Sequence, residues 1–179
     1  SINWSRIVVQ IVYYFFSYFK IAKEGEKINF SVPTGNFGDI YAGYIAKKMG
    51  LPINKLIVAT NKNDILKRVI NTGVYKPRKV EHTLSPSMDI QIASNFERLL
   101  FDVCACNPDR TLKLMDDLNQ NGEFKLGKGE IKKIKENFVS ESLSDEATKL
   151  TINKIYKEQK IFIDPHTAVA IGVMKKISL

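Results

Sequence analysis

The stretch INFSVPTGNFGDIYAGYIAKK, residues 28–48, most constrains how this chain can fold. Residues 28–32 are short and rich in strand-forming side chains, and Pro33 cannot donate to a sheet ladder. Residues 34–38 contain two glycines that permit tight turns. The apolar residues that follow recur every four positions, as in an amphipathic helix. The stretch therefore predicts a strand, a bare loop and a helix that begins directly after the loop.

A helix that begins directly after a glycine loop presents unpaired N–H groups and the positive end of its dipole to whatever fills the loop. This predicts an anion site, and a phosphate is the most plausible occupant. The Rossmann and P-loop glycine patterns are both absent, so no motif indicates a dinucleotide or a nucleoside triphosphate. The alternative is a plain turn between strand and helix, because glycines are common at such turns. Asp39 would stabilise the first helical turn but would repel a phosphate unless its carboxylate points away.

The same alternation of strand and helix continues along the chain. Residues 56–60 form a second apolar strand pattern, and Asn63 or Asp64 can cap a short helix through Val69. We therefore expect an α/β fold: a three-layer arrangement with a mostly parallel sheet and helices on both faces. Further helices are expected at residues 95–103, 109–119, 144–156 and 167–177, with a possible strand at 138–141.

Length and composition favour one domain over residues 1–179, since 44% of the residues are hydrophobic. The formal net charge of +8 and a pI near 9.4 would suit an anionic partner such as nucleic acid. Lysines are, however, interleaved with acids, with nine lysines and seven acids in residues 122–160. We therefore expect a solvated surface and no nucleic-acid partner, and we expect residues 122–160 to be a peripheral insertion.

The most apolar run, IVVQIVYYFFSYF at residues 7–19, is shorter than the roughly 20 residues that a membrane span needs. It also lacks the features of a signal peptide. The run predicts a central core helix that other elements surround on nearly all sides, and no membrane association.

Cys104 and Cys106 alternate with small residues, which disfavours a disulfide between them, and no second Cys or His pair completes a metal site. Buried free thiols in a reducing, cytoplasmic compartment are the favoured account.

Four sequence blocks in the same order carry a resemblance to a known family: PTGNFGDIYAGYIAKKMGLPI, LIVATNKNDIL, TLSPSMDI and SNFERLLF. They resemble threonine synthase, a pyridoxal 5'-phosphate (PLP) enzyme of the tryptophan synthase β-like fold type II, over most of the chain. In that family the G-N-F-G-[DN] loop holds the cofactor phosphate. The resemblance implies this role for Gly35, Asn36, Phe37, Gly38 and Asp39.

Residues 1–6 match a second segment of the family. From the residues alone, Ser1 or Asn3 as an ordinary helix cap with an exposed Arg6 is the favoured interpretation, although an arginine in the first helical turn opposes the helix dipole. The pattern S-x-N-x-x-R is similar to the family segment that holds the phosphate of O-phospho-L-homoserine, which the loop asparagine also touches. The resemblance therefore implies that Ser1, Asn3, Arg6 and Asn36 bind the substrate phosphate.

Two further blocks are weaker candidates. By chemistry alone Ser85, Ser87 and Asp89 are turn formers, and His166 is a packed or capping histidine. The similarity of TLSPSMDI and DPHTA to family blocks implies that these residues, with Thr167, lie near the active site, without individual roles.

A PLP enzyme needs a lysine that forms a Schiff base with the cofactor, and none of the lysines here has suitable surroundings. In the family this lysine lies upstream, so we expect a fragment that lacks the N-terminal part and the extreme C-terminus. The resemblance implies a parent lyase that converts O-phospho-L-homoserine and water to L-threonine and phosphate by γ-elimination and β-hydration. The alternatives are an inactive remnant, a phosphate- or PLP-binding module without turnover, and a basic nucleic-acid binder.

Overall fold

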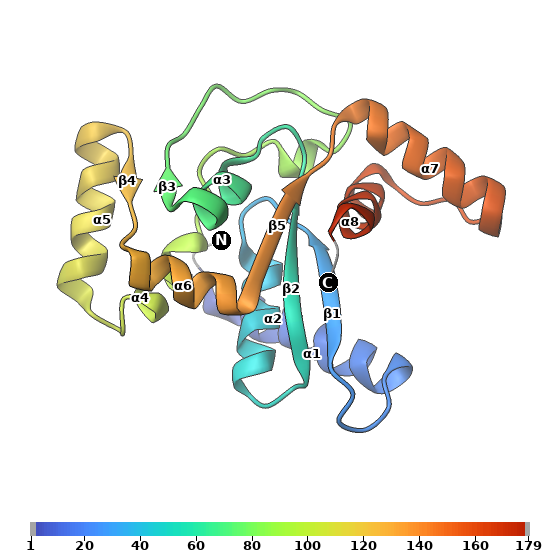
Figure 1. Cartoon of the computed structure of the whole chain (residues 1–179), viewed down its shortest axis with the longest axis horizontal. Coiled ribbons are helices and arrows are strands. Elements are labelled where there is room, and N and C mark those ends of the chain that lie inside the picture. Colours follow the sequence, from blue (N-terminus) through green and yellow to red (C-terminus); the bar gives the residue numbers. More distant parts are fainter. Residues whose placement is uncertain (1–2, 178–179) are drawn as a thin grey trace.

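A central parallel sheet organises the computed structural model, which describes residues 3–177. Its strands are β1 (Ile28–Pro33), β2 (Ile53–Thr60) and β5 (Phe138–Ser142), in the order β1-β2-β5 (Figure 1). Val58 of β2 lies opposite Val32 on one side and Ser140 on the other. The expected parallel sheet is confirmed, and a small antiparallel pair, β3 (Val74–Tyr75) and β4 (Phe124–Lys125), stands apart from it.

The helices begin and end where capping chemistry permits. Asn107, Ser144 and Asp164 each accept a hydrogen bond from a backbone N–H in the first turn of the following helix. Gly122 ends a helix in the left-handed conformation. The helices are α1 (Trp4–Ile21), α2 (Gly38–Lys48), α3 (Ile65–Thr72), α4 (Phe96–Val103), α5 (Pro108–Asn121), α6 (Lys128–Asn137), α7 (Asp145–Gln159) and α8 (Pro165–Lys176), with a 3-10 turn η1 (Pro86–Met88).

Helices cover both faces of the sheet, as expected. Alternate residues of β2 point to opposite faces: Leu56 and Val58 join the core with α1 to α4, while Ile57 and Ala59 pack against α8. Figure 1 shows α2 and α3 on one side of the sheet and α7 and α8 on the other. The fold therefore has three layers.

The charge-rich stretch 122–160 does not lie at the periphery along its whole length. Phe138 is fully buried, and β5 pairs with β2 as an edge strand of the central sheet. The alternation of buried Phe138 and Ser140 with half-buried residues gives β5 one core-facing side despite its polar sequence. The possible strand at 138–141 is confirmed, and α7 remains the outer part of this stretch.

The expectation that the apolar run 7–19 is surrounded on nearly all sides is wrong. Ile7, Ile11, Tyr14 and Tyr18 form one buried stripe, with which α1 packs against α2. On the opposite side most of the other apolar residues stay exposed, Phe16 at 62% and Phe19 at 74% among them, while Phe15 is half-buried against the core. Of residues 3–177, no helix is long and apolar enough to cross a membrane.

The two cysteines differ in environment, so the expectation of two buried thiols is half wrong. Cys104 is buried at the end of α4, and burial raises its pKa to about 11, with the Glu130 carboxylate adding to the effect. Cys106 is exposed. Ala105 and Cys106 both adopt positive φ, 59° and 56°, so the chain turns outward directly after Cys104.

Candidate anion-binding site

The glycine loop lies at the carboxyl edge of the sheet, between β1 and α2. The backbone N–H of Thr34 donates to the Ala59 carbonyl at 2.8 Å, which ties the start of the loop to the end of β2. In open α/β sheets this edge is where ligands bind. The loop predicted from residues 34–38 is therefore confirmed in the place where an anion site is expected.

Phe37 anchors this loop in the core. It occupies the position before α2 in the left-handed conformation, with φ 65° and ψ 3°, and its side chain is 1% exposed. Its ring packs edge to face against Phe96 at 5.2 Å and lies 5.6 Å from Phe138. The Phe37 side chain therefore points away from any ligand, and only its backbone can serve the predicted cofactor-binding role.

The backbone amides of this loop are available for an anion. Among residues 3–177, no hydrogen bond to another protein atom has the N–H of residues 35–39 as its donor. The loop is held instead by its carbonyls: Asn36 O accepts from Asn95, and Phe37 O accepts from the N–H of Tyr41 at 3.1 Å. Because α2 begins at Gly38, the unpaired donors and the positive end of the helix dipole coincide here.

Both glycines of the loop are required by close neighbours. A Cβ on Gly35 would lie 2.7 Å from the carbonyl oxygen of Ser87. A Cβ on Gly38 would lie 3.2 Å from Nδ2 of Asn95. Glycine therefore lets the loop pack against η1 and the start of α4 while its amides stay open on the other side.

A cavity of about 360 Å³ lies in front of the loop. It brings together the loop, the start of α1 and the turn that contains Ser87, which are far apart in the sequence. No lysine is among the described residues that line it. The lining residues are Arg6, Ile7, Gln10, Pro33, Thr34, Gly35, Asn36, Phe37, Gly38, Asp39, Ile40, Ser87 and Asn95.

The start of α1 supplies the cation of this cavity. Arg6 lines it, one turn before Gln10, and its backbone N–H donates to Asn3 O at 3.2 Å. Asn3 caps α1, because its Oδ1 accepts from the N–H of Ser5 at 2.9 Å, and it does not line the cavity. Ser1 lies outside the described residues. Arg6 and Asn36 are therefore brought together, as the resemblance implied.

Asp39 is the acidic residue at the cavity wall. Partial burial of the carboxyl group raises the pKa of Asp39, although the residue stays exposed to the cavity, and the nearby Tyr14 hydroxyl opposes the shift. The Tyr14 hydroxyl donates to the Asp39 backbone carbonyl at 3.0 Å, which joins α1 to α2. The raised pKa means that the neutral carboxyl group, which would repel an anion less, persists to a higher pH than usual.

Of Ser85, Ser87 and Asp89, two stabilise the turn and one lines the cavity. Asn61 Nδ2 donates to Ser85 Oγ at 3.0 Å and to Asp89 Oδ1 at 2.8 Å. Thr83 also donates to the Asp89 carboxylate. Ser85 and Asp89 are thus used within the protein to shape the turn, and only Ser87 of this block reaches the cavity.

His166 and Thr167 lie at the start of α8 and do not line the cavity. Asp164 caps this helix by accepting from the N–H groups of both residues and from the Thr167 hydroxyl at 2.6 Å. These hydrogen bonds lower the pKa of Asp164 to about 2. His166 Nε2 is buried without a partner among the described residues.

The polar side chains of Gln10 and Asn95 line the cavity but were not among the predicted site residues. Gln10 follows Arg6 by one helical turn, so the spacing of α1 could have indicated it. Asn95 is 1% exposed and binds the loop carbonyl of Asn36. The signal for Asn95 was its place before a helix in the SNFERLLF block.

Comparison with known proteins finds relatives that align with nearly the whole chain. No family model matches. The chain is 46% identical to threonine synthase from Saccharomyces cerevisiae and 45% identical to that from Pseudomonas aeruginosa. These alignments cover 99% and 98% of this chain.

A solved structure agrees with these relatives. The PLP-bound threonine synthase from Brucella melitensis superposes with a TM-score of 0.97 at 44% identity, over 100% of this chain and 39% of that one. The chain spans 38% of the length of both curated relatives.

Proposed function

Because the chain belongs to the threonine synthase family, we propose that its glycine loop holds the phosphate of PLP. We further propose that it forms part of an enzyme that converts O-phospho-L-homoserine and water to L-threonine and phosphate. The observation that carries the proposal is the cavity that unites Arg6 with the open amides of residues 35–39.

The loop fits a phosphate by its chemistry. Five consecutive amides, those of residues 35–39, donate to no described protein atom, and they lie at the positive end of the α2 dipole. Gly35 and Gly38 pack so closely on their neighbours that the loop has little freedom to collapse into the cavity. We therefore assign Gly35, Asn36, Phe37, Gly38 and Asp39 to the cofactor phosphate, with Phe37 contributing only its backbone.

A second phosphate, that of the substrate, would lie toward α1. Arg6 is the only cationic side chain among the described lining residues, and its planar guanidinium suits bidentate contact with phosphate oxygens. Asn36 is exposed at the loop tip, where its amide can donate to the same group. Ser1 and Asn3 remain predictions for this role.

The residues of this chain would bind and orient. When bound, PLP supplies a conjugated ring that accepts the electron pair released beside the amino-acid α carbon. Arg6 would stabilise the negative charge that develops on the departing phosphate, since preorganised donors act most strongly where charge develops. Asp39, whose pKa is raised by burial, contributes its backbone N–H to the phosphate site.

Calorimetric titration of the chain with inorganic phosphate and with PLP tests the proposal. We expect saturable binding of both, and we expect Arg6→Ala to weaken phosphate binding about tenfold through loss of a charge-assisted hydrogen bond. Arg78→Ala is the matched control, because Arg78 is also exposed and does not line the cavity. Equal affinities for the parent and Arg6→Ala would contradict the assignment of Arg6, and no heat with either ligand would contradict the site.

A second candidate function is binding of phosphate or PLP without turnover. It is favoured by the lack of lysine among the described lining residues. Incubation of the chain with PLP and O-phospho-L-homoserine tests whether the chain turns the substrate over by itself. Formation of threonine would exclude the second candidate, whereas binding by calorimetry without threonine would be consistent with it.

A further inference from the structure

Asn95 fastens the tip of the glycine loop. Its backbone N–H and its side-chain Nδ2 both donate to the carbonyl of Asn36, each at 3.1 Å. The side chain is 1% exposed, so water does not compete for these bonds. Asn95 therefore fixes Asn36, which follows the first of the two glycines of the loop.

The side chain of Asn95 serves the loop and not its own helix. Asn95 occupies the cap position of α4, where asparagine commonly accepts a hydrogen bond from the first turn. No such bond is made by its side chain. Its Oδ1 accepts instead from Nε of Arg98 at 3.2 Å. An ordinary helix cap thus does not account for this residue.

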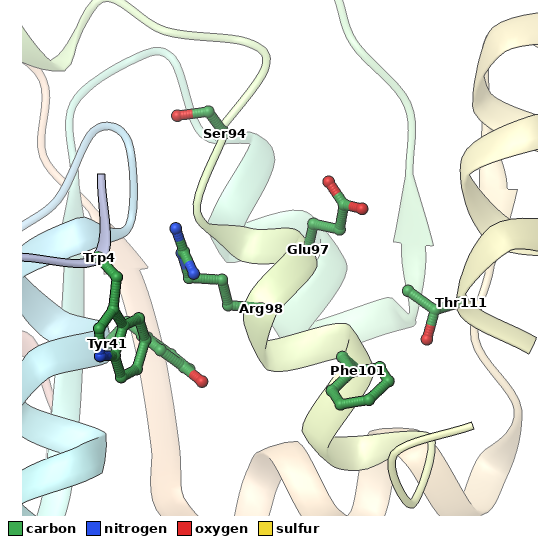
Figure 2. Close-up of a pocket in the computed structure, with 7 residues that line it drawn as sticks. All are labelled: Trp4, Tyr41, Ser94, Glu97, Arg98, Phe101 and Thr111. Carbon is green, nitrogen blue, oxygen red and sulfur yellow. The ribbon is translucent and has the colours of Figure 1, made fainter. Parts of the chain in front are cut away.

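Arg98 continues the connection to the start of α1. Its guanidinium carbon lies 5.2 Å from the centroid of the Trp4 ring, a distance typical of a cation–π contact. The Trp4 ring also meets Tyr41 of α2 edge to face at 6.1 Å. Figure 2 shows Arg98 reaching from α4 toward these two rings, at the wall of a second cavity of about 520 Å³.

The connection joins the two halves of the anion-binding cavity. Arg6 stands two residues after Trp4 on α1, whereas the open amides follow β1, so the sequence alone does not fix one against the other. Groups that bind one anion together gain affinity when their relative positions are set beforehand. Contacts from Trp4 of α1 through Arg98 and Asn95 to Asn36 of the loop provide that constraint.

We propose that Asn95 and Arg98 are positioning residues that hold the glycine loop and the start of α1 as one anion-binding unit. This inference rests on the proposed function of the cavity. It adds that the affinity for phosphate depends on two residues of α4, one of which, Arg98, does not line the cavity. It also implies that binding of an anion in the cavity changes the surroundings, and hence the fluorescence, of Trp4, the single tryptophan of the chain.

The test combines calorimetry with Trp4 fluorescence during titration with inorganic phosphate. Arg98→Lys keeps the charge but loses the planar stacking and the Nε donor. Asn95→Asp keeps the acceptor for Arg98 but replaces the Nδ2 donor by an oxygen. We expect the parent emission to change with the calorimetric midpoint, and each variant to bind phosphate at least about fivefold more weakly with a diminished emission change.

The matched control is Arg78→Lys, which should bind as the parent does. Thermal unfolding identifies variants that do not fold, and if Asn95→Asp is one of them, Arg98→Lys decides. Parental affinity and parental emission change in the folded variants would overturn the inference while leaving the proposed function intact. No phosphate binding by the parent would overturn both.

Discussion

Replacement of Gly35 by alanine is the most direct perturbation of the proposed site. The new Cβ would lie 2.7 Å from the carbonyl oxygen of Ser87 and 3.3 Å from Cα of Met88, whereas ordinary contact begins at 3.4 Å. These two atoms belong to the backbone, and the side-chain Cδ1 of Ile90 would lie 3.1 Å from the new Cβ. The loop and the turn that contains Ser87 must therefore separate by several tenths of an ångström.

The turn that contains Ser87 cannot move without loss of packing or hydrogen bonds at its neighbouring residues. Met88 is 3% exposed, its N–H donates to Ser85 O at 2.9 Å, and Ser85 is bound by Asn61. Overpacking of this kind costs about 1–3 kcal/mol. For a chain of this size that corresponds to a fall in Tm of about 2–4 °C for each kcal/mol. We also expect at least about tenfold weaker phosphate binding, because the amides move.

Urea unfolding and phosphate calorimetry of Gly35→Ala measure the two effects. Gly129→Ala is the matched control, since a Cβ at this helical position meets nothing within 4 Å and alanine favours a helix. The control should keep its phosphate affinity and gain up to about 1 kcal/mol of stability. If Gly35→Ala matched the control in both measurements, the close approach of loop and turn would not matter, and the reasoning would be refuted.

Three further predictions concern features away from the cavity. Asp164→Ala should cost about 1 kcal/mol through loss of the α8 cap. The Asp164 pKa of about 2 lies below the usual value near 3.9, so its contribution is present above pH 3.9 and lost as the pH falls toward 2. Urea unfolding between these pH values should show the parent and the variant converging, and a constant difference would contradict this. Iodoacetamide at neutral pH should alkylate the exposed Cys106 but not the buried Cys104 with its raised pKa, as mass spectrometry can verify; equal labelling in the folded chain would speak against it. The exposed apolar side of α1 predicts self-association of the chain, which light scattering measures. Phe16→Lys should reduce it with a stability change within about 0.5 kcal/mol, whereas Ile11→Lys should unfold the chain because Ile11 is buried. Equal behaviour of the two variants would count against the assignment of the two sides of α1.

The strand, loop and helix at residues 28–48 were predictable because their signals are local. Proline, the two glycines and the apolar spacing act within a few residues of the elements that they define. Arg6 was predicted as a site residue only through the family resemblance, because no local sequence pattern indicates that α1 packs against the loop. The resemblance also brought in Ser85 and Asp89, which support the turn and do not face the cavity.

What could not be predicted depends on contacts between distant residues. The bond from Asn95 to Asn36 spans 59 positions, and nothing in the sequence around Asn95 names its acceptor. The composition of residues 7–19 shows how apolar the helix is but not which of its sides contact other elements. The exposed side of α1 could therefore not be predicted from it. Residues 138–142 carry a weak strand pattern, and their place in the sheet follows from pairing with β2.

The position of Phe37 couples opening of the glycine loop to unfolding of the domain core. The Phe37 ring packs against Phe96 and Phe138, and the Phe37 backbone leads into α2. The loop therefore cannot open unless the Phe37 side chain leaves the core. The N–H of Tyr41, which donates to Phe37 O, should then exchange with solvent only when Phe37 leaves the core, whereas the open amides of residues 35–39 should exchange without unfolding. By the same coupling, an anion retained by the loop raises the unfolding free energy of the entire layer of aromatic side chains beneath it.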